Sequence, residues 1–250
     1  MEEPTYVTLS AQVALQRELE VVANNIANAS TAGFKADRQL FHTYLTQTAA
    51  PDGNVASVRG IGTYVELAPG EMQVTNNPFD VAVQGDGYLS VQTQAGVGYT
   101  RDGRLHAAAD GTLENSAAQP VLDENGQPIQ VPQNVTKLVI RGDGTINVTV
   151  DGATQDIGRI ATFRPGTVSN VEKAGDGLFG DTMPGDMQPI DPDDPASHLV
   201  QGAYEGSTVK PVSEIANLTE LSRSYDRLQR VLADDDQRES KMIDALAHAG

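Results

Sequence analysis

Apolar residues near both ends of the chain repeat with the spacing of an α-helix. Between about residues 7 and 28 they recur every three or four positions, which places them on one helical face. Near the C-terminus they occupy the two core positions of about four successive heptads. Neither segment holds a partner stripe of its own, so we expect the two stripes to pack together and against other subunits. The stripe residues are Leu15, Leu19, Val22 and Ile26, followed by Leu218, Leu221, Tyr225, Leu228, Leu232, Met242 and Leu246.

Two details modify this helical pattern. Asp235 and Glu239 fall at core positions of the C-terminal heptads, where a buried acid without a partner is costly. We therefore expect a kink, a change of neighbour or a hydrated section there. After the first helix, Ser30, Thr31 and Gly33 are typical of a helix end and a turn, and a second helical stretch is predicted to run to about Thr46.

The middle of the chain has the pattern of antiparallel strands. Between about residues 60 and 206, Asp-Gly and Asn-Gly pairs separate short runs rich in β-branched and aromatic residues. The predicted strands are residues 80–84, 88–93, 137–141, 145–150 and 159–163. Residues 181–195 contain five Asp, four Pro and no basic residue, which indicates an exposed acidic loop.

These patterns predict an α+β protein with a discontinuous helical domain. We expect residues 1–45 and 207–250 to form the terminal helical domain, residues 46–59 a linker and residues 60–206 a β-rich domain. Isolated helices of this length are marginal in water, so their stripes need a partner. This organisation is typical of a subunit that assembles.

Composition narrows the possible functions. The chain has 17 basic and 34 acidic residues and a formal charge of −17, which disfavours binding to nucleic acid or anionic lipid. There is no cysteine, and nowhere do about 18 apolar residues follow one another, so we expect no disulfide and no membrane span. The N-terminal residues lack a basic stretch followed by an apolar run, so we expect no cleaved signal peptide.

Candidate catalytic residues are few. His42, His106, His198 and His248 are scattered without the spacing of metal ligands. Paired carboxylates for glycoside hydrolysis could be sought among Asp80, Asp86, Asp102 and Asp110, but we expect these in solvated turns, where they do no acid–base work. The residues therefore predict no enzyme activity, no cofactor, no metal and no small-molecule substrate.

Several sequence blocks resemble bacterial flagellar rod and hook proteins. Residues 23–35 are similar to the N-terminal signature of that family, residues 70–89 and 99–103 to its central region, and residues 201–212 and 222–225 to the segment around the start of its C-terminal helix. The signature residues are Ala23, Asn24, Asn25, Ala27, Asn28, Thr31, Gly33, Phe34, Lys35, Asn77, Pro78, Asp80, Tyr99, Thr100, Arg101, Asp102 and Gly103.

The resemblance implies a structural subunit of the flagellar basal body. It implies that the terminal helices pair as a coiled-coil-like inner domain, with the antiparallel β-rich domain outside. Such subunits pass unfolded through the flagellar type III export apparatus and assemble with themselves and other rod proteins in the periplasm. They form a helical tube that carries torque towards the hook and encloses part of the export channel.

Three alternatives to a proximal rod subunit are open. Within the family, the short 46–59 stretch and the form of residues 80–93 favour a proximal over a distal rod subunit. Outside it, the residues also fit a secreted β-domain adhesin with an oligomerising helical stalk. A carboxylate-based hydrolase would need a cleft and a carboxyl group of raised pKa.

Overall fold

The computed structural model describes residues 2–47, 54–166, 171–175, 177–181 and 186–247. The chain forms two compact units, each assembled from separate stretches of sequence. We call them the helical unit (Met1–Ala27, Asp37–Tyr64 and Lys210–Gly250) and the β unit (Asn28–Ala36 and Val65–Val209). Helices at both ends and many antiparallel strands between them confirm the α+β class.

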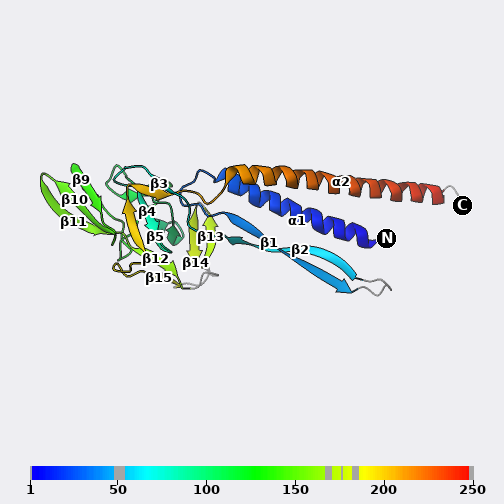
Figure 1. Cartoon of the computed structure of the whole chain (residues 1–250), viewed down its shortest axis with the longest axis horizontal. Coiled ribbons are helices and arrows are strands. Elements are labelled where there is room, and N and C mark those ends of the chain that lie inside the picture. Colours follow the sequence, from blue (N-terminus) through cyan, green and yellow to red (C-terminus); the bar gives the residue numbers. More distant parts are fainter. Residues whose placement is uncertain (1, 48–53, 167–170, 176, 182–185, 248–250) are drawn as a thin grey trace. The chain divides into compact units, whose positions relative to one another are not determined.

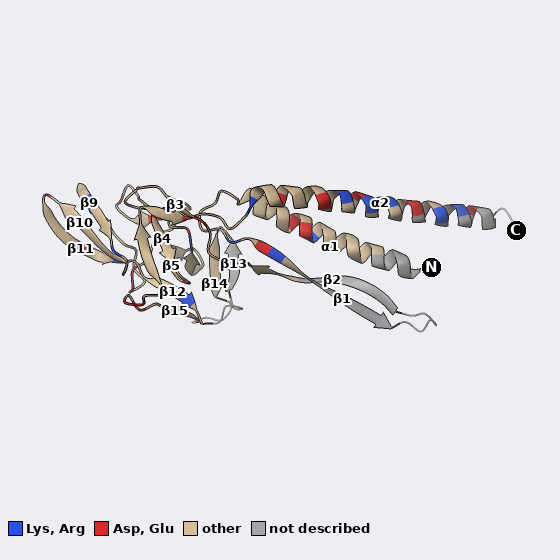
Figure 2. Cartoon of the chain, viewed as in Figure 1, with Lys and Arg blue, Asp and Glu red and all other residues tan. Residues whose placement is uncertain are grey.

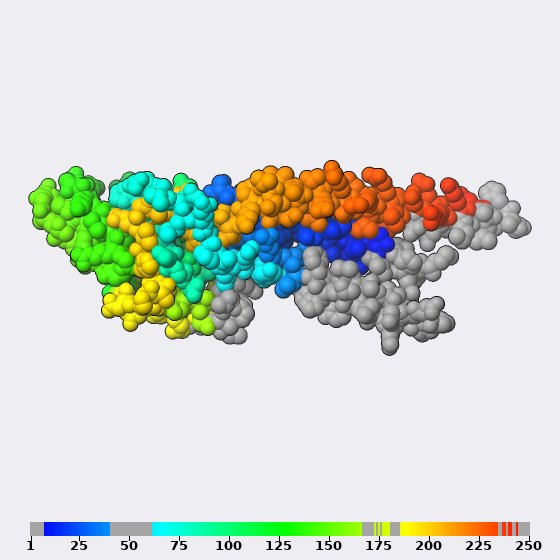
Figure 3. Space-filling model, viewed as in Figure 1, coloured from blue at the N-terminus to red at the C-terminus, as the bar shows by residue number. Residues whose placement is uncertain are grey.

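Two long helices make up most of the helical unit. Helix α1 spans Glu2–Ala27 and α2 spans Pro211–Ala247, and the two lie against each other (Figures 1 and 3). The Gln12 amide of α1 donates a hydrogen bond of 3.2 Å to the Tyr225 hydroxyl of α2. Helix α2 is continuous through Asp235 and Glu239, whose side chains lie outside the described residues, as do those of Met242 and Leu246.

A long β-hairpin stands where the sequence predicted a helix and a linker. Strand β1 (Asp37–Gln47) pairs with β2 (Asn54–Val65), so the predicted helical stretch to about Thr46 is wrong. The segment is rich in aromatic and β-branched residues, which fit a strand as well as a short helix. Residues 37–47 form a strand because a second β-favouring segment follows closely enough to pair with them in a hairpin. The spacing of apolar residues within 37–47 alone did not distinguish a helix from a strand.

Over its described residues, the β unit contains one larger sheet, one smaller sheet and three strand pairs, and the strands pair antiparallel. The six-stranded sheet has the order β13 (Val171–Gly175), β14 (Leu178–Asp181), β6 (Gly96–Thr100), β5 (Tyr88–Thr93), β12 (Thr162–Pro165) and β15 (Met187–Pro189). The three-stranded sheet has the order β11 (Ala153–Arg159), β10 (Thr145–Val150) and β9 (Val135–Ile140). The pairs are β16 (His198–Gln201) with β4 (Val81–Gln84), β17 (Ala203–Glu205) with β3 (Met72–Val74), and β7 (His106–Ala107) with β8 (Leu113–Glu114).

Most of the strands predicted from sequence are present. Strands β4, β5, β9 and β10 coincide with predicted runs to within two residues. The run at 159–163 is instead divided, because β11 ends at Arg159 and β12 begins at Thr162. Asp151 and Gly152 both have positive φ, 51° and 82°, and form the tight turn between β10 and β11 that an Asp-Gly pair favours.

A single large apolar core stabilises the β unit. It gathers inward-facing residues of both sheets and of the loops between them, with Leu89, Val91, Val121, Ile146 and Val148 wholly buried. A smaller cluster centres on Tyr88, Phe179 and Met187. Buried core residues alternate with partly buried positions along most of β10, as expected for an antiparallel strand with one face towards the core.

The surface of α2 is strongly charged. Basic and acidic residues alternate along its length (Figure 2). Neither helix, over its described residues, has an apolar stretch long enough to span a membrane.

Candidate functional site

Near the start of the signature segment at residues 23–35, the side chain of Asn25 binds the backbone of Asp37. Asn25, on the last turn of α1, is 1% exposed. Its amide group donates to the Asp37 carbonyl and its oxygen accepts from the Asp37 amide, both at 2.9 Å. Asn25 therefore pairs with the backbone as a neighbouring strand would, and it fixes the start of β1 beside the end of α1.

The residues that follow form a compact turn within the β unit. The Thr31 amide donates to the Asn28 carbonyl at 3.1 Å, and the Phe34 amide donates to the Thr31 carbonyl at 3.3 Å. Gly33 has φ of +66°, and a Cβ there would lie 2.3 Å from the backbone carbon of Arg101. A glycine is required at position 33 for both reasons.

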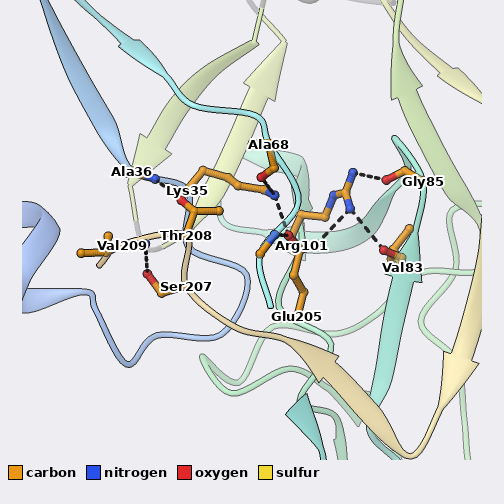
Figure 4. A network of polar contacts seen from close by, with 11 residues as sticks. Lys35, Ala36, Ala68, Val83, Gly85, Arg101, Glu205, Ser207, Thr208 and Val209 are labelled. Atoms are coloured by element: carbon orange, nitrogen blue, oxygen red, sulfur yellow. Dashed lines mark hydrogen bonds and ion pairs between the residues drawn. The ribbon is translucent and has the colours of Figure 1, made fainter. Parts of the chain in front are cut away.

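Three signature blocks meet at one buried carboxylate (Figure 4). Glu205 Oε1 accepts from Lys35 Nζ at 2.5 Å and from the Gly70 amide at 2.6 Å. Glu205 Oε2 accepts from Arg101 Nη1 at 3.0 Å. The side chains of all three charged residues are at most 4% exposed. We call Lys35, Arg101 and Glu205 the Glu205 cluster.

Backbone carbonyls complete the cluster. Lys35 Nζ also donates to the Ala68 carbonyl at 2.7 Å. Arg101 donates to the carbonyls of Val83, at 3.2 Å, and Gly85, at 2.7 Å (Figure 4). Its guanidinium also lies 4.8 Å from the centre of the Tyr88 ring. Two buried cations thus share one carboxylate and several oriented carbonyl dipoles, which compensate most of the cost of burying the charges, although Arg101 Nε has no hydrogen-bond partner among the described residues.

The cluster sets the ionisation of its own members. Burial opposes ionisation of Glu205, but the charges of Arg101 and Lys35 outweigh it and lower the pKa of the carboxyl group below its usual 4.5. Burial lowers the pKa of Lys35, and the Glu205 charge opposes that change. The carboxylate is therefore held in its charged form.

Glu205 itself was not among the residues predicted as functional. It lies in the 201–212 block that resembles the rod family, where it is the only acid. Lys35 and Arg101 were predicted as signature residues, and the structure brings both to Glu205. An acid alone in a glycine-rich block is the sequence signal that could have identified it.

The remaining signature residues stabilise turns in the β unit. Asp80, 6% exposed, accepts from the Thr75 hydroxyl at 2.6 Å and the Asn77 amide group at 3.0 Å, and this closes the loop that contains Pro78. Asp102 accepts from the hydroxyl of Ser116 and from the Arg104 amide.

The other members of the 99–103 block lie close to neighbouring strands. The Thr100 hydroxyl donates to the Gly177 carbonyl at 3.2 Å, and the Tyr99 ring lies 5.3 Å from that of Phe163. A Cβ on Gly103 would lie 1.7 Å from the Val81 carbonyl oxygen, so the chain passes β4 with no room for a side chain.

The expectation that the four acids of the hydrolase alternative lie in solvated turns is wrong for two of them. Asp80 and Asp102 are buried and hydrogen-bonded to their own loops, whereas Asp86 and Asp110 are exposed. The turns around Asp80 and Asp102 are packed against the core, which removes these carboxylates from water. Within the described part of the chain, no group of three or more His, Asp or Glu could hold a metal ion. The side chains of His42 and His248 lie outside that part.

The helices present a second candidate site, an apolar surface. Val22 is buried, and Leu15, Leu19 and Ile26 are half-buried on α1. On α2 the predicted stripe residues up to Leu232 are all half-buried, while flanking positions are mostly exposed. Large apolar residues also face outward, with exposed fractions of 51% at Leu9, 84% at Val212 and 52% at Ile215.

Comparison with known proteins identifies the family. A model described as "Flagella basal body rod protein" matches residues 6–35, one for the "Flagellar hook protein FlgE/F/G D1 domain" matches residues 82–148, and one for the "Flagellar basal body rod FlgEFG protein C-terminal" matches residues 200–245. The flagellar basal-body rod protein FlgF of Caulobacter vibrioides is 36% identical over 235 residues, 93% of each chain. The chain belongs to the flagellar basal-body rod protein family.

Other members are similar over nearly their whole length. FlgF of Mesorhizobium japonicum is 34% identical over 226 residues, 90% of each chain. FlgG of Caulobacter vibrioides is 31% identical over 249 residues, 91% of this chain and 93% of the relative. The family consists of structural rod subunits and not of enzymes, so it gives no support to the hydrolase or adhesin alternatives.

The three family matches each contribute one residue to the Glu205 cluster. Lys35 is the last residue of the first matched segment, Arg101 lies in the second and Glu205 in the third. The segments that identify the rod family in sequence are thus joined in the fold through one buried ion cluster.

Proposed function

We propose that this rod protein is a subunit of the proximal rod of the flagellar basal body. In this role it polymerises with copies of itself and with other rod proteins into a helical tube. The tube transmits torque towards the hook and encloses part of the export channel. The FlgF relatives support the proximal assignment, because the sequence resemblance connects the FlgF type with the proximal rod.

The observation that carries the proposal is the apolar surface left uncovered on the helices. Leu9 and Val13 of α1 are 51% and 44% exposed, and Val212, Ile215 and Val231 of α2 are 84%, 52% and 49% exposed. Burying one such side chain fully contributes about 1.5–3 kcal/mol. Contacts with several neighbouring subunits would bury these residues together with the half-buried stripes, and this favours assembly through the helices.

The helices then form the inner layer of the tube, paired as in a coiled coil, and the β unit forms the outer layer. The heptad positions of α2 and the hydrogen bond between Gln12 and Tyr225 support the pairing. The subunit reaches the periplasm through the flagellar type III export apparatus, without a cleaved signal peptide.

A double substitution tests assembly through the helices. Leu221→Asp with Leu228→Asp places two charges on the α2 stripe, and we expect loss of assembly and of motility while the β unit stays folded. Gln229→Asp, which adds a charge on an exposed position beside Leu228, is the matched control and should assemble normally. Normal motility in the double variant would refute assembly through the stripe.

One alternative within the family is a distal rod subunit, because the similar rod proteins include FlgG as well as FlgF over nearly the whole chain. Residue-specific cross-linking from Ile215 and from the β unit in purified hook–basal bodies separates the two assignments. Cross-links to proximal rod proteins on the inner-membrane side are expected. Cross-links confined to the hook side would favour the distal assignment.

A further inference from the structure

The chain passes between the helical unit and the β unit at four points, after residues 27, 36, 64 and 209. On the β-unit side these points belong to three segments, residues 28–36, 65–70 and 205–209. The Ala36 amide donates to the Thr208 hydroxyl at 2.8 Å, and the Ala36 carbonyl accepts from the Glu66 amide at 2.9 Å. Ala36, the last residue of segment 28–36, is therefore hydrogen-bonded to both of the other segments.

The Glu205 cluster connects the same three segments through charges. Lys35, in the first segment, binds Glu205 in the third and the Ala68 carbonyl in the second. Glu205 in turn accepts from the Gly70 amide. Buried charge-assisted hydrogen bonds are short and strong, so they hold their partners in a narrow range of positions. Arg101 then anchors Glu205 to the carbonyls of Val83 and Gly85, on and beside β4.

Segment 28–36 depends on these bonds for its position. None of its residues belongs to a strand. It is attached by the Glu205 cluster, by hydrogen bonds from Gly33 to the Glu205 carbonyl at 2.7 Å and from Thr208 to the Phe34 carbonyl at 3.0 Å, and by a small apolar cluster of Phe34, Ala36 and Val209. The Lys173 ammonium lies 3.8 Å from the centre of the Phe34 ring and adds a cation–π contact.

We infer that Lys35, Arg101 and Glu205 are positioning residues that fasten the three connecting segments into one joint, through which force on the terminal helices reaches the β unit. The second half of this inference rests on the proposed function, since only an assembled rod carries torque. The first half concerns the isolated chain. A joint of this kind distributes load among all the connections, so that no single connecting segment bears it alone.

Hydrogen exchange in the purified full chain tests the fastening. Lys35→Met removes the charge from the first segment and keeps an unbranched apolar side chain. We expect exchange at the amides of Gly33, Ala36 and Thr208 to rise by about tenfold or more through local opening. The amides of Val121 and Ile129, which bond within the core, should change much less. Equal changes at both sets would overturn the joint, because a general loss of stability acts on all amides.

Two further variants keep the test decisive. Thr208→Val removes the acceptor of the Ala36 amide without placing an unpaired charge in the interior, and it should raise exchange at the same three amides. Lys35→Met combined with Glu205→Gln should raise exchange less than the product of the single effects, since both act through one ion pair. Independent effects of the two substitutions would overturn the assignment. Glu71→Gln, at an exposed acid close in sequence to Gly70, is the control and should leave exchange unchanged.

Motility under load tests the transmission of force. Cells carrying Thr208→Val should contain normal amounts of the subunit in isolated basal bodies and swim normally in dilute medium, but swim more slowly than the wild type in viscous medium, where the torque on the rod is greater. Equal loss in both media would overturn the mechanical role. Absence of the wild-type chain from basal bodies would instead overturn the proposed function, and the exchange result would still decide whether the segments are fastened together.

Discussion

Replacing Glu205 by Gln removes the one carboxylate that two buried cations share. The substitution keeps the size of the side chain and one carbonyl oxygen that can accept from Gly70. It leaves Lys35 and Arg101, 0% and 4% exposed at their side chains, without a counter-charge. Removing one partner of a buried ion pair costs about 3–5 kcal/mol, because the remaining charge is uncompensated. With two cations affected, we expect the free energy of unfolding of the β unit to fall by an amount at the upper end of that range.

The size of this effect relative to total stability makes it measurable. Domains are stable by about 5–15 kcal/mol, so the variant loses a large share of its stability. For a unit of roughly 150 residues, 1 kcal/mol lowers the melting temperature by about 2–4 °C, so we expect a decrease of about 10–20 °C. Thermal unfolding followed by near-ultraviolet circular dichroism reports on Tyr88, which is 2% exposed beside Arg101.

Two further variants provide a ranked comparison and a control for the decrease in melting temperature. Lys35→Met should cost less than Glu205→Gln, because Glu205 then retains Arg101 and the Gly70 amide. Lys137→Met, at an exposed lysine on β9, should change the melting temperature by no more than about 2 °C. A decrease for Glu205→Gln no larger than that of Lys137→Met would refute the view that the cluster stabilises the fold.

Three further results are expected. The pKa of Glu205 is lower in the folded chain than the unfolded pKa near 4.5, so the stability that this carboxylate contributes is complete above pH 4.5 and is lost as the pH falls through the folded pKa. Denaturant unfolding between pH 6 and 3 should show this loss of stability in the wild type and a smaller loss in Glu205→Gln. Gly103→Ala would place a Cβ 1.7 Å from the Val81 carbonyl oxygen and should lower the free energy of unfolding by about 1–3 kcal/mol or more, whereas Gly142→Ala, with 3.7 Å of space, should be close to neutral in the same denaturation assay. Residues 10–28 and 215–246 should exchange rapidly in the dilute monomer, because few of the side chains that the structure describes there are buried; protected amides in both segments would contradict this.

Local sequence pattern predicts those parts of the fold that are determined by residues close together in the sequence. The helical stripes and the Asp-Gly turns were visible because spacing and turn chemistry depend only on neighbouring residues. The β1–β2 hairpin was missed because residues 37–47 fit either structure, and the partner strand decides between them. Asp80 and Asp102 were assigned to solvent because an Asp in a turn is usually exposed, and burial of those turns depends on distant strands.

The contacts within the Glu205 cluster could not be deduced from local pattern. Lys35 and Glu205 are 170 residues apart, and Arg101 and Glu205 are 104 residues apart. No periodicity connects residues at such separations, so each of the three charges, taken alone, would be assigned to the surface. The sequence nonetheless marked their positions, because each lies in a block that resembles the rod family.

The Glu205 cluster lies where the connecting segments meet, so residues from three separate sequence blocks depend on one another there. A subunit whose helices assemble with neighbours while its β unit folds separately needs its connecting segments held in fixed positions. Residues 28–36 have no strand to hold them, and apolar burial there is small: Phe34, Ala36 and Val209 form a cluster with Ala29, and Ala32 is buried as well. Directional, charge-assisted bonds can fix a short segment that has little apolar area to bury. A substitution at Lys35 is therefore expected to act on Ala36 and Thr208 before it acts on the core, and this order of effects distinguishes a joint from an ordinary buried ion pair.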